Sequence, residues 1–116
     1  MKRRAKFGLA RPVLFLNLTV QNQLGGSGEP GYLSLHALLR APPLWDVAGR
    51  AIFVCENPDL VAIAADALGV ECAPLACTDG MPAAAQRTLL MQLSAAGARL
   101  HYCTIALLHC DGSGGR

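Results

Sequence analysis

The chain has 116 residues, of which 53% are hydrophobic and 16% are charged. These values fit one small globular domain with a real core, and they exclude an intrinsically disordered chain. The net charge of +2 is too small to indicate a nucleic-acid-binding protein by itself.

The N-terminal segment, residues 1–11, is basic. Its lysines and arginines could contact the phosphates of DNA, and the candidates are Lys2, Arg3, Arg4 and Lys6. A solvated tail is the more common outcome for such a charge run. We therefore expect a tail over 1–11, a folded domain over 12–108 and a frayed, glycine-rich end over 109–116.

The folded part begins with a strand. Residues 12–20 are apolar and β-branched, as in a strand. Residues 21–31 then break regular structure with four glycines and a proline. Residues 25–28, Gly-Gly-Ser-Gly, resemble a phosphate-binding loop, but neither a Gly-Lys-Ser/Thr motif nor a helix follows directly. We expect a flexible connector.

A short helix follows over residues 35–40. Ser34 is a suitable N-cap, and Pro42 and Pro43 end the helix. One apolar face is expected from Leu35, Leu38 and Leu39. We expect Trp45 to anchor the following connector, residues 44–50, against the core.

The central stretch, residues 51–80, predicts a β-α-β unit. Residues 51–55 and 74–77 are unbroken apolar runs, which is typical of parallel strands covered on both faces. Asn57 caps the intervening helix, Pro58 suits its first position and Gly69 ends it. Its expected apolar face comprises Leu60, Ile63, Ala64, Ala67 and Leu68.

The same pattern continues to the end of the domain. A helix is expected from about Pro82 to Gly97, with an apolar face of Leu89, Leu90 and Leu93, and a strand over 99–108. The order β-α-β-α-β predicts a three-layer, Rossmann-like α/β domain with a mostly parallel sheet.

Polar residues follow the two apolar strands directly. Glu56 and Asn57 follow the first, and Thr78 and Asp79 follow the second. Ligands of open α/β sheets bind outside the carboxyl ends of the strands, so these four residues are the candidate cleft. Structural explanations stay open: the helix dipole favours Glu56 where it stands, Asn57 is a cap, and turn chemistry accounts for Thr78 and Asp79.

The cysteines and the hydropathy favour a cytoplasmic protein. No stretch approaches the roughly 18 apolar residues of a membrane-spanning helix, and the run over 13–20 lacks a signal-cleavage site. An odd number of cysteines without a C-x-x-C pair indicates reduced thiols. A zinc site is a weaker alternative, since the spacings are not those of short zinc knuckles; it would use Cys72, Cys77, Cys103, His109 and Cys110.

Several strings together carry a family resemblance. They are Val-Leu-Phe-Leu-Asn-Leu at 13–18, the segment 32–43, Ile-Phe-Val-Cys-Glu-Asn-Pro at 52–58, Cys-Thr-Asp-Gly-Met-Pro at 77–82 and Gly-Ala-Arg-Leu-His-Tyr at 97–102. The region 13–102 resembles the C-terminal, toprim-like domain of the D subunit of Wadjet-type, SMC-associated bacterial anti-plasmid defence systems.

The resemblance implies metal-dependent DNA cleavage, with Mg²⁺ as cofactor and with DNA and SMC-like subunits as partners. Glu56 matches the family glutamate, as metal ligand or general acid/base. The family's D-x-D pair falls on Ile105 and Leu107, which cannot hold a cation, and Asp111 stands in a different context. We expect a truncated and diverged domain that is inactive alone, since one carboxylate is a poor Mg²⁺ site.

Two other functions stay open. The chain could be a small α/β module that binds a nucleotide or phosphate, in which case a nucleotide would stabilise it without metal. It could also be a structural remnant that self-associates through an unpaired sheet edge and responds to no ligand.

Overall fold

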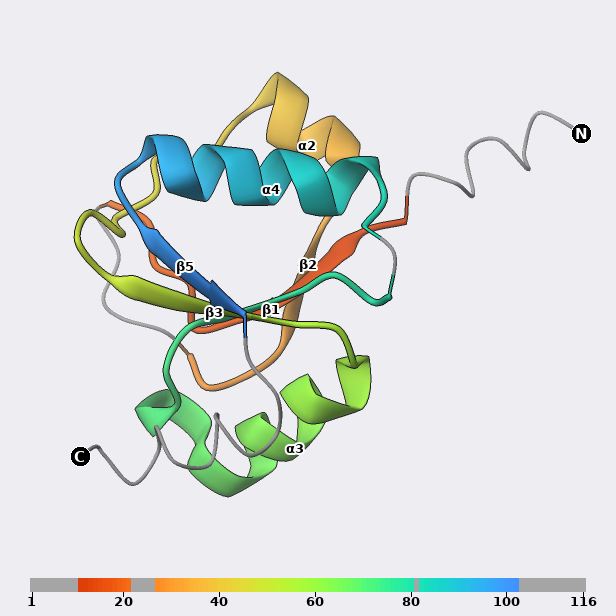
Figure 1. Ribbon diagram of the computed structural model, residues 1–116, viewed down its shortest axis with the longest axis vertical. Coiled ribbons are helices and arrows are strands. Elements are labelled where there is room, and N and C mark those ends of the chain that lie inside the picture. The colour runs from red at the N-terminus through yellow and green to blue at the C-terminus, as the bar shows by residue number, and fades with distance from the viewer. Residues whose placement is uncertain (1–10, 22–26, 81, 103–116) are drawn as a thin grey trace, which may run out of the picture.

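The computed structural model describes residues 11–21, 27–80 and 82–102. Helix α3 (Pro58–Leu68) covers one face of a five-stranded sheet, and helices α2 (Leu35–Arg40) and α4 (Ala84–Ala95) cover the other (Figure 1). The strands are β1 (Val13–Leu16), β2 (Gly31–Leu33), β3 (Ala51–Cys55), β4 (Leu75–Cys77) and β5 (Arg99–Tyr102). The expected three-layer α/β fold is confirmed.

The sheet has the order β2-β1-β4-β3-β5 and is mixed. Strand β3 runs parallel to β4 and to β5, as expected of the β-α-β-α-β region. Strand β1 runs antiparallel to both of its neighbours, β2 and β4, so only the β4-β3-β5 part of the sheet is parallel, which is less than the mostly parallel sheet expected. The direction of a strand depends on the path of its connections, and the residues of β1 do not encode that path.

Strand β1 ends earlier than the apolar pattern indicates. Asn17 has a φ of 56°, in the left-handed region, and this turns the chain out of the strand. The chain then runs antiparallel to the 44–46 connector, where the amide of Gln21 donates to the carbonyl of Leu44 at 2.8 Å. Strand β2 lies at the end of the stretch expected to be a connector.

The helix ends agree with their sequence signals. Ser34 Oγ accepts from the amide of Ala37 at 3.0 Å, and Asn57 Oδ1 accepts from the amide of Asp59 at 2.9 Å. Gly69 ends α3 with a φ of 54°. These contacts supply partners for amides that no helical carbonyl reaches.

The two faces of the sheet bury two separate apolar clusters. Leu16, Phe53, Leu60, Val61 and Leu75 are among the residues that pack under α3, while Leu38, Ile52, Leu89 and Leu93 pack with Trp45 under α2 and α4. The expected faces of two helices need correction. Leu39 of α2 is exposed, and so are Ile63 and Ala67 of α3. Helix α3 meets the sheet with Leu60, Ala64 and Leu68 as expected, but its buried face extends to the side of Val61 rather than to the side of Ile63.

Trp45 anchors its connector as expected. The indole is buried, and its Nε1 donates to Gln92 Oε1 of α4 at 3.1 Å. Gln92 Nε2 in turn donates to the carbonyl of Leu38 at 3.0 Å. Gln92 therefore joins α4 to both α2 and the connector. Among the described residues, no helix is long and apolar enough to cross a membrane.

Candidate functional site

The ends of β3 and β4 bring the predicted cleft residues to one edge of the sheet. Cys55 and Cys77 are paired positions in the two strands. Beyond them, the amide of Thr78 donates to the carbonyl of Cys55 at 2.8 Å, and the amide of Gly80 donates to the carbonyl of Glu56 at 3.1 Å. Glu56 thus lies beside the 78–80 turn, 22 to 24 positions away along the sequence.

The four predicted residues differ in what their side chains are free to do. Glu56 is exposed at the end of the strand that lies between β4 and β5. Asn57 is exposed, but its Oδ1 caps α3. Thr78 is buried and its Oγ1 donates to the carbonyl of Cys55 at 3.3 Å. Of these three, Glu56 has the side chain best placed to meet a ligand.

Asp79 pairs with Arg11, the last residue of the basic segment that was expected to be a tail over 1–11. Its backbone is left-handed, with a φ of 56°, and its Oδ2 lies 2.7 Å from Nη1 of Arg11. The side chain of Arg11 is 42% exposed and that of Asp79 is 47% exposed, so solvent screens the pair. Gln86 Nε2 donates to the carbonyl of Pro12 at 3.4 Å, which ties the residue after Arg11 to α4.

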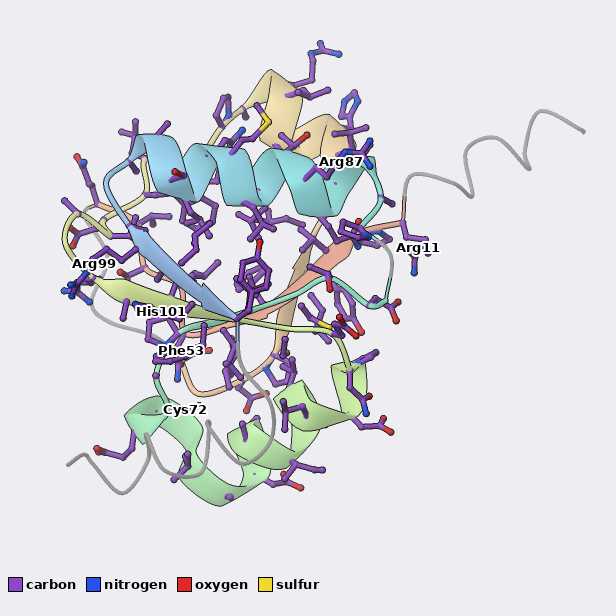
Figure 2. All side chains as sticks on the ribbon, viewed as in Figure 1. Arg11, Phe53, Cys72, Arg87, Arg99 and His101 are labelled. Carbon is purple, nitrogen blue, oxygen red and sulfur yellow. The ribbon has the colours of Figure 1, made fainter. Side chains whose placement is uncertain are left out.

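The contact between Arg11 and Asp79 spans 68 positions, and no local pattern indicates it. Figure 2 shows Arg11 on the side of the molecule where α4 begins, with Arg87 also on that side. Arg87 Nη1 donates to the carbonyl of Pro82 at 2.9 Å and so supports the loop that precedes α4.

Two thiols lie directly beneath this edge. Cys55 and Cys77 are each 1% exposed. A hydrogen bond from the Cys55 side chain lowers the pKa of the Cys77 thiol, and a hydrogen bond from the Asp79 backbone amide lowers it further. Burial of the thiol and the negative charge of the Asp79 carboxylate both raise this pKa. The net direction is downward.

The described residues do not form a magnesium site by themselves. Among them, no three histidine, cysteine, aspartate or glutamate side chains converge as a metal-binding group. Glu56 is a single carboxylate, and Asp79 is engaged with Arg11. A divalent ion with one or two carboxylates needs further ligands from substrate phosphates or water.

Several predicted residues lie outside the described ranges. They are the four basic candidates Lys2, Arg3, Arg4 and Lys6, the two D-x-D positions Ile105 and Leu107, the nearby Asp111, and three of the five possible zinc ligands, Cys103, His109 and Cys110.

An open groove of about 540 Å³ lies elsewhere in the fold. It is formed by the connector after α2 and the last turn of α4, and its lining includes Pro43, Leu44, Trp45 and Ala96. None of the predicted cleft residues contributes to it.

Comparison with known proteins identifies a family. A family model described as "Protein of unknown function C-terminus (DUF2399)" matches residues 31–104, which is more than half of the chain. No curated protein matches, and no solved structure matches.

Proposed function

This chain belongs to the DUF2399 C-terminal family, and we propose that it is a toprim-like domain of a bacterial DNA-processing defence subunit, like the D subunit of Wadjet-type systems. One observation carries the proposal. Glu56 is an exposed acid directly after β3, and β3 lies between two parallel neighbours. A toprim domain uses a glutamate at this place, where ligands of α/β sheets bind.

The proposal includes a specific deficiency. DNA cleavage of this kind needs hard oxygen ligands for Mg²⁺ and a fixed position for the phosphate. Glu56 supplies one carboxylate, Asp79 is paired with Arg11, and the D-x-D positions hold Ile105 and Leu107. We therefore propose that this polypeptide is cytoplasmic, that it does not cleave DNA alone, and that DNA and SMC-like subunits are its partners.

Introducing aspartates at the two D-x-D positions tests the role of Glu56. In an Ile105→Asp/Leu107→Asp variant, we expect millimolar Mg²⁺ to raise the melting temperature, since the variant restores the D-x-D pair that the resemblance joins with Glu56 in one metal site. The parent chain should show no such rise. Adding Glu56→Gln to the double variant should remove the effect, whereas Asp66→Asn, at an exposed acid near the end of α3, should preserve it.

A nicking assay and the gene itself complete the test. We expect the parent chain to leave supercoiled plasmid intact with Mg²⁺, at the level of Glu56→Gln. Nicking by the parent that Glu56→Gln abolishes would overturn the proposed deficiency. Every reading frame downstream of the Ala98 codon should be translated and searched for the D-x-D pair of the family; finding that pair would mean that the natural product carries a complete site.

A phosphate-binding module is the second candidate. The position of Arg11 favours this candidate, because a guanidinium at the strand ends can bind a phosphate in place of the Asp79 carboxylate. This candidate predicts that a nucleotide stabilises the parent chain without metal, and that Arg11→Gln removes this stabilisation while Glu56→Gln does not.

A non-catalytic remnant is the third candidate. The exposed Tyr102 on edge strand β5 favours it. It predicts concentration-dependent oligomers by light scattering, and no response to Mg²⁺ or nucleotide.

A further inference from the structure

Two cysteines occupy paired positions at the ends of neighbouring strands. Cys55 is the last residue of β3, Cys77 is the last residue of β4, and the register places them opposite each other. Both belong to the cluster under α3, so their side chains lie on the same face of the sheet. The Cys55 thiol also donates to the carbonyl of Asn57 at 4.0 Å, so it lies at the carboxyl end of β3, level with Cys77.

The sheet geometry suits a covalent bond between them. Adjacent strands lie about 4.8 Å apart, and a disulfide needs Cα atoms separated by about 4.4–6.8 Å. Residues in register on one face of neighbouring strands therefore need little backbone movement. Glu56 and Asp79 are exposed and the cysteines end their strands, so a local opening that breaks the bonds of Thr78 to the Cys55 carbonyl would expose both thiols without global unfolding.

We propose that Cys55 and Cys77 are an oxidisable dithiol. Hydrogen peroxide is the oxidant, and the product is a disulfide bond between the two cysteines. The Cys77 thiolate attacks one oxygen of the peroxide, the O–O bond breaks, and Cys77 becomes a sulfenic acid as the leaving hydroxide takes a proton to form water. The Cys55 sulfur then attacks the Cys77 sulfur. The S–O bond breaks, and the departing hydroxide takes the Cys55 proton to form a second water.

The electrons balance in this sequence. Two thiols lose two electrons and two protons in total, and one peroxide is reduced to two waters. The product is a bond between β3 and β4, immediately before Glu56 and the 78–80 turn. This proposal does not depend on the function proposed above, because its readout is the state of the thiols.

Cys72 is the natural competitor and the matched control. It is 4% exposed and packs in the same cluster. It lies before β4, at the amino end of the strand, whereas Cys55 and Cys77 lie at the carboxyl ends. Figure 2 shows Cys72 below the sheet, on the side of the molecule away from Arg11. Arg11 contacts Asp79 and therefore lies at the carboxyl ends of the strands.

The experiment uses the full chain with Cys103→Ser and Cys110→Ser, so that three thiols remain. The protein is treated with hydrogen peroxide, and its remaining thiols are alkylated. It is then digested, without reduction, with a protease that cleaves after glutamate residues. Cleavage after Glu56 and Glu71 separates Cys55 from the fragment that holds Cys72 and Cys77. We expect these two fragments to be linked in most molecules, with the loss of two hydrogens, and to separate on treatment with dithiothreitol.

Variants assign the link. Cys72→Ser should leave the yield of linked fragments unchanged, and Cys77→Ser should reduce it at least tenfold. A second measurement follows the urea midpoint, which should rise on oxidation because the bond closes the 55–77 loop in the unfolded chain. Unlinked fragments after peroxide treatment, a Cys55–Cys72 link, or a lower urea midpoint in the oxidised chain would each overturn the proposal.

Discussion

Asn17 and Asp79 share an uncommon backbone conformation but have opposite surroundings. Each is a non-glycine residue with a φ of 56°, in the left-handed region that costs most side chains energy. Asn17 is 8% exposed, whereas the side chain of Asp79 is 47% exposed. Asn17 bonds to two other segments of the chain, and Asp79 pairs with the guanidinium of Arg11.

The side chain of Asn17 is satisfied on both ends. Its Nδ2 donates to the carbonyls of Gly69 at 2.9 Å and of Cys72 at 3.0 Å, and its Oδ1 accepts from the amide of Gly28 at 2.9 Å. These bonds join the end of β1, the loop before β2 and the turn before β4. The comparison teaches that a left-handed polar residue ties segments together where it is buried and networked, and carries little structure where it is exposed and makes one solvent-screened pair.

The largest effect is expected from Asn17→Ala. The variant leaves two carbonyls and one amide without their partner and keeps a left-handed backbone without a compensating bond. We expect the free energy of unfolding to fall by about 3 kcal/mol, measured by urea denaturation with circular dichroism. A loss below about 1 kcal/mol would mean that water replaces the side chain.

Asn17→Gly separates the two contributions. Glycine accepts the left-handed conformation, so the variant should recover about 1 kcal/mol relative to Asn17→Ala. Equal stability of the two variants would contradict a backbone contribution.

The next largest effect is expected at two glycines: Gly28, which bonds to Asn17, and Gly80, which follows Asp79. Gly28 has a φ of 79°, and a Cβ there would lie 2.7 Å from the amide nitrogen of Val70. Gly80 has a φ of 86°, but a Cβ there would meet nothing within 4 Å. We expect Gly28→Ala to destabilise by about 2–3 kcal/mol and Gly80→Ala by about 1 kcal/mol. Equal urea midpoints for the two variants would show that the 28–70 contact relaxes freely.

The smallest stability effect is expected at the exposed ion pair. Asp79→Asn keeps a residue type that tolerates the left-handed region and removes only the charge. We expect a change of about 0.5 kcal/mol or less, and no additional loss when Arg11→Gln is combined with it. High salt should remove the difference between the parent and the variants. A loss above about 1 kcal/mol that persists in high salt would contradict the solvent-screened description.

The parts of the fold that could be predicted are those specified by adjacent residues. The bounds of β3 and α2 and the caps at Ser34 and Asn57 follow from apolar runs and from side chains that bond the backbone two or three positions ahead. Strand β2 could not be predicted, because three residues in a glycine- and proline-rich stretch become a strand only by pairing with β1.

The candidate site divides in the same way. The placement of Glu56 next to the 78–80 turn follows from two apolar strands that end in polar residues. The Arg11–Asp79 pair and the contacts of Asn17 join positions 68, 52 and 55 apart, and such contacts are set by how the layers pack. The antiparallel direction of β1 is unpredictable for the same reason.

The contact between Trp45 and Gln92 gives the protein an internal optical reporter. Trp45 is the only tryptophan of the chain, and it lies in the cluster under α2 and α4. Its emission should shift to longer wavelength when α4 leaves the sheet and water reaches the indole. The opposite face, under α3, contains no tryptophan in the described part of the chain. Fluorescence and circular dichroism followed together should therefore show whether the two layers separate from the sheet in one step or in two.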